Sequence, residues 1–97
     1  MKKYLIVNAD DYGHTYGVSE GIRIAHQQGI VTSTTAMMNY QPSLETLKIA
    51  QTTCPNLGLG VHLVLTSGRP LLPAQKVPSL VKPDGTFFGY DAFIEHL

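Results

Sequence analysis

The chain has 97 residues, 43% of them hydrophobic, and its seven basic and seven acidic side chains give a formal charge of zero. This length allows at most one domain, and the balanced charge excludes the basic excess that is typical of nucleic-acid-binding proteins. The only cysteine cannot form an internal disulfide, and the first apolar run ends at Asn8, so we expect a cytoplasmic protein with no signal peptide and no membrane partner.

Apolar and turn-forming residues predict strands that alternate with helices. Runs of apolar or β-branched residues indicate three strands, at residues 4–9, 30–38 and 57–65. Helical periodicity and capping residues indicate three helices: residues 19–28, a second that opens at Pro42-Ser43 and ends within residues 52–55, and a third with Asp91 as its N-cap. The stretch from Thr66 to Gly89 contains four prolines and a turn at Asp84-Gly85, and we expect it to be irregular.

The spacing of the strands predicts an α/β fold. The strands begin about 26 residues apart, which suits successive βα units, and parallel strands need helical crossovers of this kind. A (β/α)₈ barrel takes roughly 250 residues. Three units therefore form either a small open sheet or the first part of a barrel.

Asp10-Asp11 is the sharpest local feature of the sequence. Parallel α/β proteins bind ligands at the carboxyl ends of their strands, and this acidic pair follows the first strand. Strand alternation puts Asn8 and Asp10 on one face, with Asp11 leading into the loop. Two adjacent carboxylates repel each other unless a cation or hydrogen bonds compensate, which favours a metal site. Ordinary turn chemistry of aspartate is the alternative, and the pair alone does not decide between them.

His62 supports the metal hypothesis through its position in the third strand. The apolar side chains at alternate positions of residues 59–65 are expected to pack against helices, which leaves Gly60 and His62 on the opposite face. His62 then points to the same side as Asn8 and Asp10. Aspartate together with histidine suits a divalent cation that keeps positions open for water and substrate. The alternative is a core histidine whose ring is hydrogen-bonded to a backbone carbonyl.

The remaining candidates are weaker. His14 follows the acidic loop and could approach a substrate, but an exposed loop histidine is the simpler interpretation. We assign no role to His26, His96 or Cys54. The hydroxyl side chains of residues 32–35 could line a pocket, although β-propensity explains them equally well. The sequence contains no phosphate-binding glycine loop.

Five motifs follow one another along the chain. They are residues 8–13 (NADDYG), 17–22 (GVSEGI), 29–37 (GIVTSTTAM), 58–63 (GLGVHL) and 65–70 (LTSGRP). In this order they closely resemble the YdjC/ChbG-like carbohydrate (chitooligosaccharide) deacetylase family. The resemblance extends over essentially the whole chain, and several linked motifs are far more specific than any single one.

The resemblance implies a deformed (β/α) barrel, of which residues 1–97 would form the N-terminal portion of a single domain. It implies metal-dependent hydrolysis of N-acetyl groups from amino sugars or oligosaccharides, with magnesium as the usual metal and zinc as another. By resemblance, Asp10 is the general base for the attacking water, and Asp11 and His62 are metal ligands. Arg69 could bind the carbohydrate substrate. Metal-activated water and a neighbouring carboxylate suit this reaction.

Members of the family have roughly 250 residues, like other (β/α) barrels. Their third metal ligand and a further histidine, the general acid, come from a segment beyond position 97. The resemblance therefore implies a fragment with little activity alone. An unfinished barrel exposes a strand edge and an apolar face, so we also expect a homo-oligomer.

Three alternatives belong to other classes of function. A phosphoacceptor receiver domain also has an acidic pair after its first strand, but residues 63–66 lack the aspartate that such a domain phosphorylates. A non-catalytic metal- or sugar-binding protein would use the same residues without hydrolysis. A purely structural assembly piece would not need the metal ligands at all.

Overall fold

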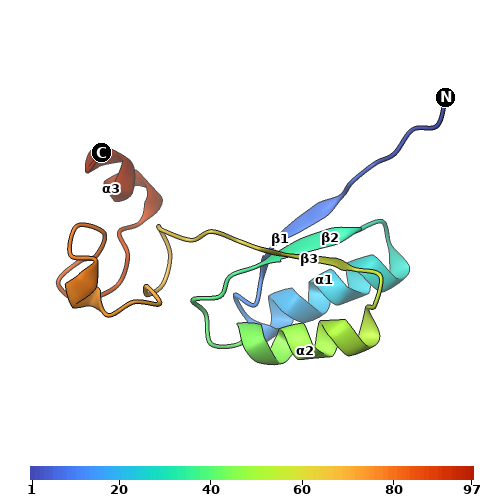
Figure 1. Cartoon of the computed structure of the whole chain (residues 1–97), viewed down its shortest axis with the longest axis horizontal. Coiled ribbons are helices and arrows are strands. Elements are labelled where there is room, and N and C mark those ends of the chain that lie inside the picture. Colours follow the sequence, from blue (N-terminus) through green and yellow to red (C-terminus); the bar gives the residue numbers. More distant parts are fainter. The chain divides into compact units, whose positions relative to one another are not determined.

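The computed structural model describes all 97 residues and divides them into two compact units, residues 1–62 and 63–97. The first unit contains β1 (Asn8–Tyr12), α1 (Tyr16–Gln28), β2 (Ser33–Ala36), α2 (Ser43–Thr53) and β3 (Gly58–Val61) (Figure 1). The second contains a short 3₁₀-helix, η1 (Ala74–Lys76), and α3 (Tyr90–Glu95). All of the helices are too short or too polar to cross a membrane.

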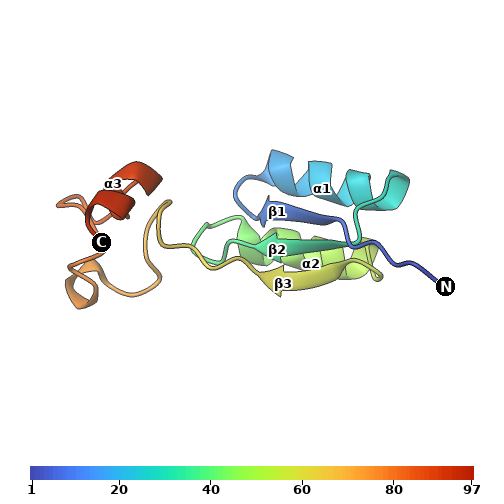
Figure 2. The ribbon, with the colours of Figure 1, turned by 90° about the horizontal axis from the view of Figure 1, so that it is seen from above.

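The three strands form one parallel sheet in the order β1-β2-β3, and α1 and α2 lie on the same face of it (Figures 1 and 2). Each pair of consecutive strands is joined through a helix, as parallel pairing requires. Ala9 pairs with Thr34, and Thr34 with Leu59, so these three side chains share the face that the helices cover. The predicted α/β fold with parallel strands is confirmed.

The core of the first unit lies between the sheet and its two helices. Tyr12, Ile22, Ala36 and Ala50 form the buried cluster. The Tyr12 hydroxyl donates to the backbone oxygen of Thr46 and accepts a hydrogen bond of 2.9 Å from Nη1 of Arg23. A buried phenol needs such partners. Tyr12 therefore fixes the carboxyl end of β1 against both α1 and α2.

The first strand lies later in the chain than predicted. Tyr4, Leu5 and Ile6 precede it and are exposed, Tyr4 by 88%. Pairing with the second strand begins only at Val7, whose backbone oxygen accepts a hydrogen bond of 2.9 Å from the amide of Thr32. The apolar pattern predicts a strand from side chains alone. The strand forms only where the backbone of the second strand is beside it to pair with. As a result, the acidic pair lies within β1 and not after it.

The other two strands are shorter than predicted, and β3 lies at an open edge of the sheet. Leu59 and Val61 are on the helix-covered face but remain 39% and 65% exposed. Leu63 and Leu65, in the second unit, are exposed as well. The prediction that these side chains pack against helices is wrong. Neither α1 nor α2 packs extensively against β3, so its apolar side chains face solvent.

Two of the predicted helix starts also need correction. Helix α1 begins at Tyr16, because the Thr15 hydroxyl caps it by accepting a hydrogen bond of 3.0 Å from the amide of Val18. Helix α3 has Gly89 at its N-cap, and Asp91 lies in its first turn. There the negative charge still suits the N-terminal end of the helix. Helix α2 begins at Ser43, as predicted.

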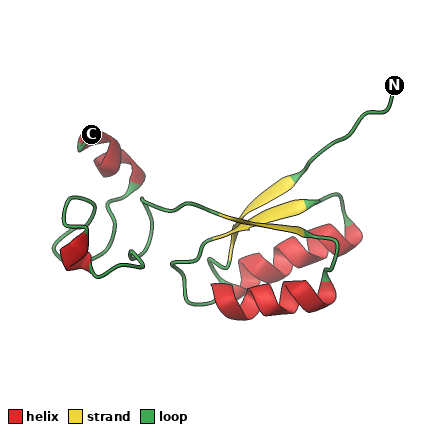
Figure 3. Cartoon of the chain, viewed as in Figure 1, coloured by secondary structure: helices red, strands yellow, loops and turns green.

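The second unit consists mainly of loops, as Figure 3 shows. The predicted turn at Asp84-Gly85 is present. The amide of Lys82 donates to the backbone oxygen of Thr86 over 2.8 Å, and Gly85 has a φ of +85°. An isolated antiparallel bridge joins Val81 to Phe87 around this turn.

Candidate metal centre

The face of the sheet opposite the helices is polar. Ser33 Oγ donates to Asn8 Oδ1 over 2.8 Å, and Asn8 Nδ2 donates to Asp10 Oδ1 over 2.8 Å. Thr35 Oγ1 donates to the same oxygen of Asp10 over 3.2 Å. Thr34 points to the other face, where its hydroxyl donates to the backbone oxygen of Ala9 over 2.6 Å. Two donors therefore hold one oxygen of Asp10 and leave Oδ2 outside the network.

The Ser33–Asn8–Asp10–Thr35 network was not anticipated from the sequence. Strand alternation predicts Asn8 and Asp10 on one face. For the hydroxyl residues 32–35, β-propensity is as good an explanation as a pocket lining. Alternation along β2 could have resolved them. Ser33 and Thr35 must share a face, and parallel register puts that face beside Asn8 and Asp10.

A β-bulge interrupts β1 at the acidic pair. The register between β1 and β2 shifts between Ala9 and Tyr12, and Asp11 has a φ of +72°, the only positive φ at a non-glycine residue of the chain. Strict alternation would turn Asp11 towards the helices. The bulge redirects its side chain instead, which is a common function of bulges beside ligand sites.

The redirected carboxylate of Asp11 meets His62. Oδ1 of Asp11 and Nδ1 of His62 lie 3.3 Å apart, and the side chains are 50% and 30% exposed. Nδ1 itself is buried and makes no hydrogen bond, because the contact with Asp11 has the distance but not the direction of one. His62 directly follows β3, and its amide donates to the backbone oxygen of Ala36 over 2.9 Å. The backbone of His62 is thus held beside β2, and Nδ1 of its ring has no hydrogen-bond partner.

The pair fits a divalent cation in chemistry and in spacing. Two ligand atoms that each lie roughly 2.1 Å from one cation are about 3.0–3.4 Å from each other at octahedral or tetrahedral angles. The Asp11–His62 separation falls within this range. No group of three or more His, Cys, Asp or Glu side chains lies together anywhere in the chain. The chain therefore brings together two candidate ligands, whereas a metal site normally has three or more.

Buried serines fix the loop that follows Asp11. Ser19 Oγ accepts a hydrogen bond of 2.9 Å from the amide of Gly13 and donates to the backbone oxygen of Thr15 over 2.9 Å. Gly13 has a φ of +86°, and a Cβ atom there would lie 2.8 Å from Cα of Ser43. The loop is consequently held between the N-terminal ends of α1 and α2, which limits the movement of Asp11.

The weaker sequence candidates lie elsewhere or have other partners. His26 and His96 hydrogen-bond through Nδ1 to backbone oxygens, over 2.7 Å and 2.8 Å, and Cys54 is buried. His14 is half-buried and its ring contacts Tyr40, so the interpretation as an exposed loop residue is wrong.

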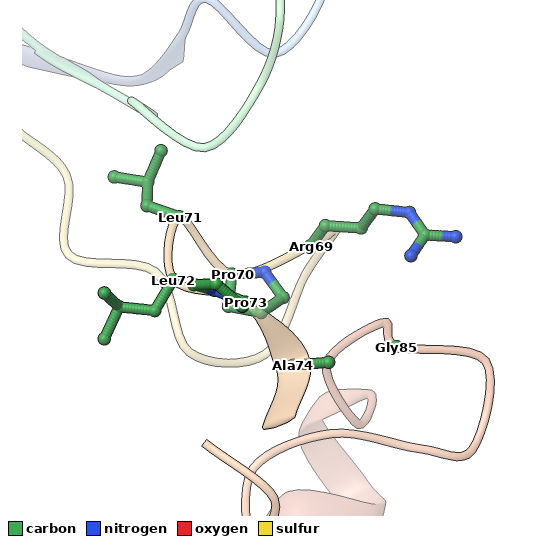
Figure 4. Close-up of a pocket in the computed structure, with 7 residues that line it drawn as sticks. All are labelled: Arg69, Pro70, Leu71, Leu72, Pro73, Ala74 and Gly85. Atoms are coloured by element: carbon green, nitrogen blue, oxygen red, sulfur yellow. The ribbon is translucent and has the colours of Figure 1, made fainter. Parts of the chain in front are cut away.

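A cavity of about 350 Å³ lies in the second unit (Figure 4). It is lined by Arg69, Pro70, Leu71, Leu72, Pro73, Ala74 and Gly85. Nη1 of Arg69 donates to the backbone oxygen of Asp84 over 3.1 Å, and the side chain extends away from Leu71 and Leu72. Because the cavity has no carboxylate or imidazole in its lining, we place no metal chemistry there.

Comparison with known proteins identifies the family. The sequence profile of the YdjC-like proteins matches residues 4–96. The chain belongs to the YdjC-like protein family. A carbohydrate deacetylase of Enterococcus faecalis is 46% identical over 95 residues, which is 96% of this chain and 36% of that protein. A chitooligosaccharide deacetylase of Proteus mirabilis is 46% identical over 85 residues, which is 84% of this chain and 31% of that protein.

A solved structure shows that the similarity extends to the fold. A crystal structure of an Enterococcus faecalis protein, named as a candidate cellobiose-phosphate cleavage protein, superposes with a TM-score of 0.91 at 45% identity. The match covers 95% of this chain and 36% of that one. The chain thus spans about a third of the length of the relatives that it matches.

Proposed function

We propose that this chain carries the metal-binding start of a carbohydrate deacetylase. Residues 1–97 would form the first three βα units of a (β/α) barrel that is one domain. The observation that carries the proposal is the contact between Asp11 and His62, 3.3 Å apart, with a buried Nδ1 that has no hydrogen bond. An unsatisfied buried nitrogen beside a carboxylate is costly unless a cation joins them.

The residues of the site divide into two roles. Asp11 and His62 would hold a divalent cation, magnesium or zinc. When bound, the cation would polarise the acetyl carbonyl and lower the pKa of its water. Asp10 would act as the general base, because two hydrogen bonds orient its carboxylate and leave Oδ2 to accept a proton from the attacking water. The substrate would be an N-acetylated amino sugar or its oligosaccharide, with acetate as a product.

The ligand count limits what the chain does alone. Catalytic zinc sites use three protein ligands, and the chain brings together only two candidates. We therefore expect weak metal binding and little hydrolysis without further ligands. The same shortage keeps one alternative open, a non-catalytic metal- or sugar-binding protein.

The first test is calorimetric titration of Mg²⁺ and Zn²⁺ into the chain and its variants. Asp11→Ala and His62→Ala should each weaken binding about 10-fold or more, since each removes one of two ligands. Asp91→Ala and His96→Ala are matched controls from α3 and its end, and both should bind like the parent. If all of the variants bind the metal ions equally well, Asp11 and His62 do not form a metal site.

The second test measures the reaction. The corresponding third of the Enterococcus faecalis carbohydrate deacetylase is replaced by this chain, and acetate release from N-acetylglucosamine oligosaccharides is followed. The chimera should release acetate, and Asp10→Asn should abolish the release while metal binding persists. Metal binding without any acetate release would favour the non-catalytic alternative. A cellobiose phosphate serves as the comparison substrate, and its cleavage in place of deacetylation would overturn the proposal.

A further inference from the structure

We propose that His14 and Tyr40 form a contact surface for the sugar ring of the substrate. The two rings lie with their centroids 4.6 Å apart and their planes at 81°, an edge-to-face arrangement. Both side chains are half-buried, so each is partly packed and partly open to solvent. We call them the aromatic pair. This inference rests on the proposed function and specifies what recognises its substrate.

The aromatic pair lies at the same edge of the sheet as Asp11 and His62. His14 is in the β1–α1 loop, and its amide donates to the backbone oxygen of Asp11 over 3.1 Å. Tyr40 is in the β2–α2 loop, and its amide donates to the backbone oxygen of Met37 over 3.2 Å. Both loops leave the carboxyl ends of neighbouring strands (Figure 2). Ligands of parallel α/β proteins bind at this end.

Buried serine hydroxyls fix the two loops that carry the aromatic pair. Ser19 holds the first loop through the amide of Gly13. Ser43 Oγ holds the second through a hydrogen bond of 2.7 Å to the backbone oxygen of Met37. Both loops are fixed by buried hydroxyls, and the aromatic pair adds a partly exposed surface between them.

The composition of this edge suits a carbohydrate. A pyranose ring has an apolar face of C–H groups and a rim of hydroxyls. The negative face of an aromatic ring attracts the C–H groups, and polar side chains nearby take the hydroxyls. The aromatic pair would supply the first kind of contact, and Asp10 and Thr35, which lie nearer this edge than Asn8 and Ser33 do, would supply the second. Because the two ring planes are nearly perpendicular, one sugar ring would stack on the face of one of the two rings and lie beside the other.

The test is NMR titration of the ¹⁵N-labelled chain with N,N′-diacetylchitobiose in metal-free buffer. Saturation of the His14 and Tyr40 ring protons should transfer to the C–H protons of the sugar, a result that needs no variant. Tyr40→Leu and His14→Leu should weaken binding about 3- to 10-fold, the range that an aromatic contact supplies. Tyr40→Phe should bind within about twofold of the parent, because the ring remains. Tyr90→Leu, an exposed tyrosine of α3, is the matched control.

The outcomes separate this inference from the proposed function. Absence of saturation transfer in the parent overturns the inference, and so does equal binding by the parent and both leucine variants. Amide spectra show whether each variant is folded, and if a leucine variant is not, the transfer experiment on the parent decides. Metal binding and acetate release are measured independently, so either proposal can fail while the other holds.

Discussion

Nδ1 of His62 lies 3.3 Å from Oδ1 of Asp11, and the contact depends on an unusual backbone conformation at Asp11. Its φ of +72° is in the left-handed region, which costs a residue with a side chain about 1 kcal/mol. Aspartate tolerates this region better than most residues do, but the cost persists. The structure thus accepts strain at the position where the carboxylate is turned towards a histidine, which is typical of functional sites.

This strain predicts an inverted order of stability for two substitutions. At Asp11, the Gly variant should be more stable than the Ala variant by about 1 kcal/mol, because only glycine adopts a positive φ freely. At Asp10, which has a negative φ, Ala should be the more stable of the two. Urea unfolding of the four variants measures both differences. If the Ala variant is the more stable of the two at both positions, the positive φ at Asp11 is contradicted.

Ser19 should matter more for stability than its size suggests. Ser19→Ala removes the acceptor of the buried Gly13 amide, and leaving such a group unsatisfied costs about 1–3 kcal/mol. The loop that carries Asp11 should loosen as well, so hydrogen exchange at Gly13 should accelerate. Ser79→Ala, at an exposed position of the second unit, is the control and should change neither quantity. Unchanged exchange at Gly13 would show that Ser19 does not hold the loop.

Replacement of glycine by alanine should change the stability in opposite directions at two positions of the first unit. Gly13→Ala should destabilise the fold by about 2 kcal/mol or more, since the positive φ and the overlap with Ser43 act together. Gly21→Ala should stabilise it by up to about 1 kcal/mol, because Gly21 lies within α1 and a Cβ there has nothing within 4 Å. Thermal or urea unfolding of both variants provides the measurement. Two variants of equal stability would refute the tight packing at Gly13.

Local patterns were enough to predict the fold class and the neighbourhood of the site. The order of strands and helices follows from periodicity and from signals such as Pro42-Ser43, which opens α2 as predicted. Once the strands are parallel, their carboxyl ends share one edge, so a meeting of the acidic pair with His62 follows from topology. The metal, its ligands and the general base stay predictions.

The details that local patterns missed depend on contacts between distant parts of the chain. Tyr4 to Ile6 have the composition of a strand but no partner beside them, so β1 forms later. The bulge at Asp11 leaves no mark in the sequence, since aspartate is compatible with both conformations. The contact of His14 with Tyr40 joins two loops whose relative positions only the packed helices determine. Propensity and periodicity contain none of this information.

The turn at Asp84 should respond to pH in a defined direction. The hydroxyl of Thr86 donates to Asp84 Oδ1 over 2.6 Å and its amide over 3.0 Å, and these bonds, the hydroxyl first, hold the pKa of Asp84 below its ordinary value. A carboxyl group whose pKa is lowered by folding stabilises the folded state fully above its ordinary pKa. That contribution is lost as the pH falls through the lower, folded value.

The measurement for Asp84 is an NMR titration of its carboxyl carbon. Thr86→Val removes the largest cause of the shift and should raise the pKa of Asp84 towards its ordinary value. Lys82→Met removes a smaller, purely electrostatic cause and should raise the pKa by less. An equal or larger effect of Lys82→Met would contradict the assignment to hydrogen bonding.

The open edge of β3 predicts concentration-dependent self-association. Val61 is 65% exposed and Leu59 39% exposed on a strand whose outer backbone groups have no neighbouring strand. Such an edge pairs readily with another chain, and a lysine on it opposes pairing by placing charge where strands would meet. Sedimentation velocity over a range of concentrations should therefore show dimers or larger species for the parent and a shift to monomer for Val61→Lys. Leu44→Lys adds the same charge at an exposed leucine of α2 and should leave the association unchanged. If both variants dissociate equally, net charge and not the edge of β3 controls association. If the parent is monomeric at every concentration, the predicted homo-oligomer does not form.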